Sequence, residues 1–228
     1  MTSHGVNTGH IVTLGAMRRA SVKESKEPPA TGAAPAPRRA QVPERLLAVA
    51  LTLFAEQGYE GTSVQEIVAA AGVTKGAMYH YFDSKDDLLY AIYHRLLGLQ
   101  SEHLDAIADG PGSAETRVRA AAVDVVETTL DSIDEAIVFF RSMHMLPSDK
   151  QALVRAERRR YHERFRALVE EGQREGSFRD DVPSDIAVHF FFGTVNRLGT
   201  WYHAHGNLTR KQIAEHYADL FLGGLQKT

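Results

Sequence analysis

Apolar side chains recur every three or four residues along most of the chain, which is the period of an amphipathic α-helix. The first such stretch begins near residue 43 and carries its apolar face on Leu46, Ala50, Leu53 and Phe54. No stretch combines sustained alternation of apolar and polar residues with turn signals, as a β-strand would. The pattern therefore predicts an all-α protein.

Start and stop signals divide the first part of this pattern into short helices. Gly58 is placed to end the first helix, and Ser63 opens the capping-box pattern of a second. Thr74 can cap a third helix over Lys75–Tyr81, and Ser84 can cap a long fourth one. Two short helices joined by a tight turn that contains glycine are the layout of a helix-turn-helix motif.

The rest of the chain keeps the helical period and completes the domain plan. Five more helices are expected, over residues 115–130, 134–145, 149–173, 183–204 and 209–224. Residues 1–40 are rich in Pro, Ala and Gly and lack an apolar period, which predicts a disordered basic tail. Residues 41–92 would form the helix-turn-helix domain and residues 93–228 a larger helical domain. The reading frame could also start at Met17.

Composition excludes several classes of protein. The 228 residues include no cysteine, so disulfide scaffolds, thiolate metal sites and a cysteine nucleophile are excluded. We find no secretion signal and no apolar run long enough to span a bilayer, and we expect a cytoplasmic protein without membrane contacts. Nucleotide-binding loops, hydrolase motifs and an HExxH pattern are also missing, so we expect no catalytic site, metal site or cofactor.

Charge alone does not predict a nucleic-acid binder. Residues 1–40 hold six Lys and Arg against two Glu, but residues 41–92 hold only three against seven acids. Any contact with DNA must therefore depend on where the few cations lie. Arg38 and Arg39 remain open between a solvated tail and an arm that reaches the DNA backbone or minor groove.

The third helix is the candidate DNA reader. It would enter the major groove with its amino end first, where free N–H groups and the helix dipole suit a phosphate oxygen. Gly76 would allow close approach of the backbone, and Tyr79 and His80 lie on a face that reaches phosphates or thymine methyls. Met78 and Phe82 are four residues apart and would point inward together.

The stretch "TSVQEIVAAAGVTKGAMYHYFDSKDDLL" resembles the amino-terminal domain of TetR/AcrR-family transcriptional regulators. The resemblance implies a homodimer with about nine helices per subunit, whose first three helices bind a palindromic operator in double-stranded DNA. The larger domain would dimerise and hold a small-molecule effector. Carried over residue by residue, the DNA-contacting positions are Ser63, Thr74, Lys75, Gly76, Tyr79, His80, Tyr81 and Lys85. A base-reading position falls on Ala77, whose methyl group can touch thymine but cannot form a hydrogen bond.

The second half of the chain offers candidates for the effector site and the dimer seam. Phe190, Phe191 and Phe192 are consecutive and cannot all enter one core, so one or two would face a cavity or a partner subunit. Asn196 follows one helical turn later and is either a cavity amide or a surface amide. The last helix carries an apolar stripe that we interpret as part of a four-helix dimer seam, formed by Ile213, Tyr217, Leu220, Phe221 and Leu225.

The stretch "NRLGTWYHAHGNLTRKQIAEHYADLFLGGL" resembles the carboxyl-terminal end of TetR-family regulators that respond to acyl-CoA thioesters. This resemblance implies an apolar tunnel for the acyl chain and cations for the CoA phosphates. The tunnel would be built partly from Phe140, Met143, Phe192 and Trp201. The cations would be Arg141, His144 or the six arginines between Arg155 and Arg166. Those arginines are alternatively a solvated face laced by pairs such as Arg159–Glu163.

Two functional readings come from different classes. The first is a ligand-responsive transcriptional repressor that a small molecule, such as an acyl-CoA or a cationic or hydrophobic drug, releases from DNA. The second is a small-molecule binding protein of the same fold whose helix-turn-helix is vestigial. An enzyme would need turnover, and no nucleophile, base and orienting group are arranged together in this sequence.

Overall fold

The computed structural model describes residues 41–227, and within them every regular element is a helix. The elements are α1 (Val42–Gln57), α2 (Val64–Ala70), α3 (Lys75–Tyr79), α4 (Lys85–Ala108), α5 (Ala114–Asp131), α6 (Ile133–Ser142), the 3₁₀ helix η1 (Met143–Met145), α7 (Ser148–Arg174), α8 (Ser184–Val195), α9 (Leu198–Trp201) and α10 (Arg210–Leu225). The all-α prediction is confirmed, and the helix count agrees with about nine if the single turn α9 is set aside. The predicted tail and the arm at Arg38 and Arg39 lie outside the described residues.

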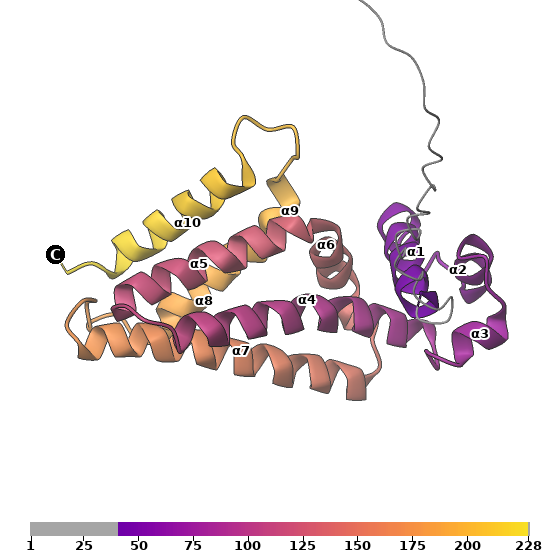
Figure 1. Ribbon diagram of the computed structural model, residues 1–228, viewed down its shortest axis with the longest axis horizontal. Coiled ribbons are helices and arrows are strands. Elements are labelled where there is room, and N and C mark those ends of the chain that lie inside the picture. The colour runs from indigo at the N-terminus through magenta and orange to yellow at the C-terminus, as the bar shows by residue number, and fades with distance from the viewer. Residues whose placement is uncertain (1–40, 228) are drawn as a thin grey trace, which may run out of the picture. The chain divides into compact units, whose positions relative to one another are not determined.

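The first three helices pack together (Figure 1), and their buried side chains belong to the same apolar core as those of the later helices. Leu46, Ala50 and Phe54 of α1 are buried, as the sequence pattern predicts, and Ile67 of α2 is fully enclosed beside them. The φ angle of Gly72 is +61°, a left-handed conformation that favours glycine, and it turns the chain from α2 into α3. Met78 closes this core from α3 with no exposed surface.

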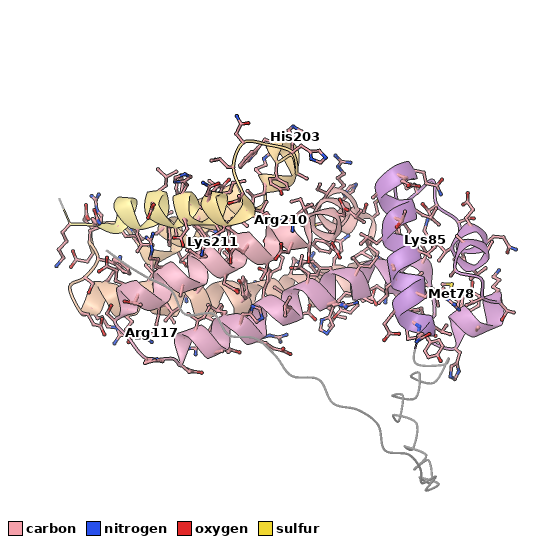
Figure 2. The ribbon with its side chains drawn as sticks, turned by 45° about the horizontal axis from the view of Figure 1, so that its top comes forward. Met78, Lys85, Arg117, His203, Arg210 and Lys211 are labelled. Atoms are coloured by element: carbon pink, nitrogen blue, oxygen red, sulfur yellow. The ribbon has the colours of Figure 1, made fainter. Side chains whose placement is uncertain are left out.

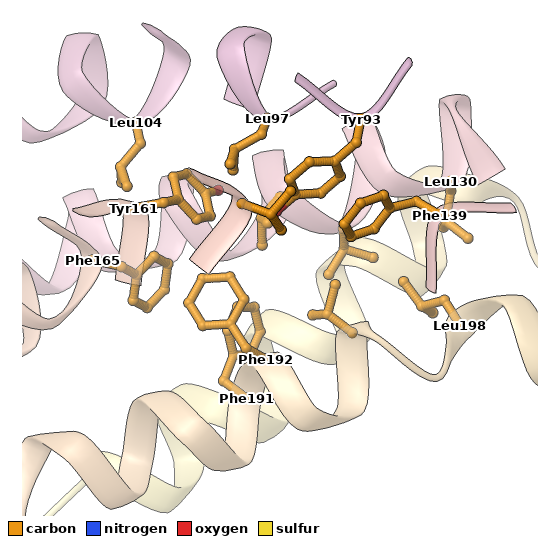
Figure 3. Close-up of a cluster of buried hydrophobic side chains, with 14 of the residues drawn as sticks. Tyr93, Leu97, Leu104, Leu130, Phe139, Tyr161, Phe165, Phe191, Phe192 and Leu198 are labelled. Atoms are coloured by element: carbon orange, nitrogen blue, oxygen red, sulfur yellow. The ribbon is translucent and has the colours of Figure 1, made fainter. Parts of the chain in front are cut away.

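The remaining helices form a bundle around α5. This helix packs against α4, α7 and α10, and its buried face consists, apart from Leu130, of Ala, Val and Thr residues that allow neighbours to come close. The long helices α4, α5 and α7 run side by side, as Figure 1 shows. The larger buried side chains fill the space between α4, α7 and α8, where Phe165 and Phe191 stack with ring centres 5.4 Å apart (Figure 3).

Three predicted helices end differently in the structure. The third ends at Tyr79 instead of Tyr81, because the N–H groups of Tyr81 and Phe82 both donate to the carbonyl of Met78 at 2.9 Å and close a turn. The helix expected over 134–145 tightens into η1 for its last turn. The helix expected over 183–204 breaks after Val195, where bonds to the third preceding residue replace the α pattern.

The predicted boundary between residues 92 and 93 falls inside α4, which is continuous from Lys85 to Ala108. A single rigid rod therefore links the helix-turn-helix module to the bundle. The position of the domain boundary stays a prediction.

Candidate nucleic-acid interface and effector cavity

The amino end of α3 is exposed and its cap is built by local hydrogen bonds. Thr74 has an extended backbone, and its hydroxyl oxygen accepts a bond of 3.1 Å from the N–H of Ala77. The N–H groups of Lys75 and Gly76 belong to the first helical turn and have no partner inside the helix. A Cβ on Gly76 would meet only the Thr74 hydroxyl, at 3.9 Å, so the backbone is accessible there.

The aromatic run after this cap faces outward, as expected of a DNA-reading surface. The exposed fraction is 44% for Tyr79 and 37% for Tyr81, and His80 is exposed between them. Lys75 Nζ lies 5.7 Å from the centre of the Tyr79 ring, and the rings of His80 and Tyr81 meet edge to face. Met78 and Phe82 instead pack toward the core, so the division of the run into outward and inward residues agrees with the sequence.

Besides Thr74, Ser63 and Lys85 make hydrogen bonds within the module. Ser63 caps α2, where its hydroxyl accepts a bond from the Glu66 N–H and the Glu66 carboxylate bonds back to Ser63. Lys85 Nζ donates to the backbone carbonyls of Tyr59 and Thr62 at 2.7 and 2.8 Å, and it lies over the Tyr59 ring. Only one of the three N–H groups of this ammonium remains available to a phosphate. Figure 2 shows Lys85 and Met78 within the same module.

The amino end of α4 joins the module to the bundle. The Tyr59 hydroxyl donates to the Asp86 carboxylate, and burial together with this bond raises the pKa of Tyr59. The next residue, Asp87, pairs with Lys150 of α7 and accepts a bond from the Ser84 hydroxyl. Burial by itself raises the pKa of Asp87, but the bonds from Lys150 and Ser84 outweigh it and lower the pKa below its ordinary value.

A cavity lies in the bundle between α4, α5, α6, α7 and α8. Its volume is about 40 Å³, room for a few water molecules, so a larger ligand would have to widen it. The lining residues are Tyr93, Leu96, Leu97, Gln100, Val125, Thr129, Ala136, Phe140, Arg158, Tyr161, His162, Phe192, Val195 and Asn196. A second pocket of about 70 Å³ continues toward α9 and adds Arg141 and Gly199 to the wall.

The charge on the cavity wall has one sign. No carboxylate lines either pocket, whereas Arg158 and Arg141 do. The Arg158 guanidinium lies 5.1 Å from the centre of the Phe140 ring. Burial and the nearby Arg158 lower the pKa of His162 to about 4, so this ring is neutral at pH 7. The wall suits an apolar body with a negatively charged or neutral polar end.

The structure places four of the seven predicted effector residues at this cavity. Phe140, Phe192 and Asn196 line the first pocket, and Arg141 lines the second. The other three do not line either pocket. Trp201 is 46% exposed and stacks on Tyr217, because the break after α8 redirects the chain, and Met143 and His144 lie on η1, with His144 exposed. The assignment of all seven residues as effector contacts stays a prediction.

Sequence reasoning missed five polar or aromatic residues of the first pocket, namely Tyr93, Gln100, Thr129, Tyr161 and His162, and it named Arg158 only as one of six arginines. Gln100 carried a signal, because it falls on the same helical face as Leu96, Leu97 and Leu104. An amide in the middle of an apolar stripe indicates a side chain that forms hydrogen bonds inside the protein. Nothing in the sequence distinguished Arg158 from its five neighbouring arginines.

The six arginines between Arg155 and Arg166 have different surroundings in the structure. Arg164 pairs with Asp105 and Asp109 of α4, and Arg166 pairs with Glu170 and Asp185. The pair expected between Arg159 and Glu163 does not form in the described structure. Most of the run therefore holds helices together or faces solvent, and its contribution to the cavity is Arg158.

The apolar stripe of the last helix has a different role from the one expected of it. Ile213, Phe221 and Leu225 are buried within the subunit and pack against the bundle, because α10 lies along α5. The exposed apolar surface is instead formed by Leu220 of α10, 77% exposed, with Phe190 and Ile186 of α8, 66% and 60% exposed. Nothing lies within 4 Å of the Cβ positions of Gly193, Gly223 or Gly224 along the same helices.

Residues 41–227 contain no group of three or more His, Asp or Glu side chains arranged to hold a metal ion. Within the same range no helix has the length and apolar character that crossing a membrane requires.

An exposed helix-turn-helix reader on a helical body defines the class of this protein as a DNA-binding transcription regulator. Two family models match the chain. Residues 46–92 match the bacterial regulatory proteins of the tetR family, and residues 111–225 match the tetracyclin repressor-like carboxyl-terminal domain. The chain belongs to the TetR family.

Individual relatives agree with this assignment. The transcriptional repressor KstR2 of Rhodococcus jostii is 30% identical over 186 residues, which cover 79% of this chain and 89% of the relative. A solved tetR-family regulator from Rhodococcus has a TM-score of 0.75 at 25% identity, covering 82% of this chain and 98% of that one. AibR, solved in complex with isovaleryl coenzyme A and operator DNA, has a TM-score of 0.69 at 27% identity, covering 78% of this chain and 96% of that one.

Proposed function

We propose that this protein is a homodimeric repressor that an acyl thioester in the bundle cavity releases from its operator. The observation that carries the proposal is that α4 contacts both the helix-turn-helix module and the cavity. Its amino end, Ser84–Asp87, contacts the helix-turn-helix module, and its middle, at Tyr93, Leu97 and Gln100, lines the cavity. A molecule that moves α4 would therefore shift the recognition helix.

The mechanism is a coupling free energy between two sites. In a dimer, two recognition helices enter successive major grooves about 34–36 Å apart. An effector that favours a different spread of these helices weakens operator binding without touching DNA. A coupling of about 3 kcal/mol would lower operator affinity on the order of 100-fold.

Charge on the cavity wall supports an acyl thioester over a cationic drug. A cation in the cavity would lie beside Arg158 and Arg141, and no carboxylate lines either pocket to offset their repulsion. Arg158 and Arg141 suit the phosphates of coenzyme A, and the Phe and Leu side chains suit an acyl group. AibR, with its isovaleryl coenzyme A, is a structural neighbour in which both partners of the proposed function were captured.

The test measures operator binding and its release. The operator is first selected from random DNA by the full chain, and binding is followed by fluorescence anisotropy at fixed salt. Changing Lys75 and Tyr79 together to alanine should lower operator affinity at least about 30-fold, because a phosphate contact and a groove contact are lost. The matched control is Lys211→Ala, an exposed lysine on α10 that Figure 2 places far from Met78.

The same assay then compares isovaleryl-CoA, octanoyl-CoA and a cationic dye as releasing agents. Release by a thioester at micromolar concentration supports the proposal. If no thioester releases the protein from DNA, the proposed effector is wrong. If the double variant binds the operator as tightly as wild type, the proposed DNA-binding face is wrong. A chain that selects no DNA but binds thioesters would be the alternative small-molecule binding protein.

A further inference from the structure

Three uncharged polar groups at the cavity lack a hydrogen-bond partner among the described residues. They are the hydroxyls of Tyr93 and Tyr161 and the side-chain oxygen Oε1 of Gln100. The exposed fractions of these residues are only 5%, 6% and 7%. None of the three atoms is itself fully buried, so each reaches the cavity, where water or a ligand can bond to it.

The orientation of the Gln100 amide follows from its neighbours. Its Nε2 lies 2.9 Å from the Thr128 hydroxyl and 3.1 Å from the Thr129 hydroxyl. Each threonine donates its own proton to a backbone carbonyl, Thr128 to Asp124 and Thr129 to Val125. Both hydroxyls therefore offer only a lone pair to Gln100, which requires the NH₂ group on their side. Oε1 is left as an unpaired acceptor.

The two phenols are donors under all ordinary conditions. Burial raises the pKa of both Tyr93 and Tyr161 well above the usual value for tyrosine. Figure 3 shows Tyr161 on α7 with its hydroxyl on the side facing Tyr93, which comes from α4. Among the groups on the cavity wall, the phenols of α4 and α7 are thus two uncharged donors, and Oε1 of Gln100 is an uncharged acceptor.

The two phenols and the Gln100 oxygen favour some acyl groups over others. A plain alkyl chain would leave all three groups unpaired, and an unsatisfied buried polar group lowers affinity. A carboxylate at the same place would face the Gln100 acceptor. A keto oxygen accepts from both phenols, and a hydroxyl group can also donate to Oε1 of Gln100.

We infer that the effector bears a keto or hydroxyl oxygen on its acyl group, held by the hydroxyls of Tyr93 and Tyr161 and by the side-chain oxygen of Gln100. This inference rests on the proposed acyl-thioester function and narrows it to oxygenated acyl groups. It assigns a ligand-recognition role to three residues that sequence reasoning did not select.

The test removes only the two hydroxyls. The full chain and its Tyr93→Phe/Tyr161→Phe variant are titrated by calorimetry with cyclohexanecarbonyl-CoA and with its 3-oxo and 4-oxo derivatives. Wild-type protein should bind at least one oxo derivative about tenfold more tightly than the parent thioester, and the variant should bind the two within about twofold. Tyr217→Phe is the matched control, because Tyr217 is half-buried on α10 and lines neither pocket.

The outcomes separate this inference from the proposed function. If wild-type protein binds parent and oxo thioesters equally, or if the variant keeps the preference, the inference is wrong while thioester-driven release can still hold. If no thioester binds, the inference and the proposed effector fail together. Because calorimetry uses protein without DNA, a chain that binds no operator would still reveal the oxo preference. Thermal unfolding of the variant within a few degrees of wild type shows that its fold is intact.

Discussion

Lys85 has a structural role in addition to the DNA contact predicted for it. The family resemblance assigns it a phosphate contact, yet its ammonium already donates to the carbonyls of Tyr59 and Thr62. These carbonyls belong to the connection between α1 and α2, where no helix supplies a partner. At the residue scale, Lys85 therefore tethers the start of α4 to the α1–α2 connection.

Replacing Lys85 with methionine separates the two roles. Methionine keeps most of the apolar stem but removes both bonds, so we expect a loss of about 2 kcal/mol in the free energy of unfolding. Urea denaturation measures this loss, and Lys211→Met, an exposed lysine without such bonds, should change stability by less than about 0.5 kcal/mol. A variant of unchanged stability that no longer binds the operator would instead identify Lys85 as mainly a phosphate contact.

At the scale of elements, the contact between α4 and α7 connects the cavity to the helix-turn-helix module. Helix α7 contributes Arg158, Tyr161 and His162 to the cavity wall, and its first turn carries Lys150, which pairs with Asp87. The exposed fractions of the two side chains are 19% and 23%, so solvent screens the pair only partly. A displacement of α7 by the effector would act on α4 directly through this pair.

The pair makes stability depend on pH. Because the pKa of Asp87 is lowered in the folded state, its contribution is present above the unfolded pKa of about 4 and is lost as the pH falls through the folded value. Lys150→Met should raise the pKa of Asp87 and cost about 1 kcal/mol at pH 7, with a smaller cost near pH 3. Urea denaturation at both pH values measures it, and a cost that does not change with pH would contradict the role of charge.

The same variant tests coupling. Lys150→Met leaves the cavity residues and the exposed face of α3 unaltered. We expect its operator and effector affinities, each measured alone, to stay within about threefold of wild type, while the effect of one ligand on the other shrinks. Equal coupling in both proteins would show that α7 does not transmit the signal through this pair.

At the scale of the whole molecule, the exposed faces of α8 and α10 carry the proposed homodimer. Ile186 and Phe190 of α8 and Leu220 of α10 are large apolar side chains that a monomer would leave in water. Open space above Gly193 and Gly223 would let a partner helix approach closely. This surface shares Leu220 with the stripe that the sequence pattern of the last helix suggested, whereas Ile213, Phe221 and Leu225 of that stripe are buried within the subunit.

Leu220→Glu should convert the dimer to a monomer. A carboxylate buried in an apolar seam without a partner raises the dissociation constant on the order of 100-fold or more. Sedimentation velocity at micromolar concentration measures the change, and affinity for a full palindrome should fall with it. Leu153→Glu on α7, where Leu153 is 51% exposed, is the control and should remain dimeric. A dimeric Leu220→Glu protein would rule out this seam.

The sequence by itself determined the helices of the first module and the division of its third helix. Spacing placed Met78 inward and Tyr79 and His80 outward, because the helical period and the cap at Thr74 are local properties of a few turns. The same reasoning predicted an all-α chain and the approximate bounds of most later helices.

Only the tertiary structure decided which partner each side chain meets. Leu220 and Phe221 are neighbours in one stripe, yet one is exposed and the other buried, because α5 covers a single face of α10. Tyr93 and Gln100 lie on α4 and Tyr161 lies on α7, far away in the sequence, so their meeting at the cavity depends on how these two helices pack. Periodicity specifies which face of a helix is apolar, whereas the neighbour of that face depends on long-range packing that no local pattern contains.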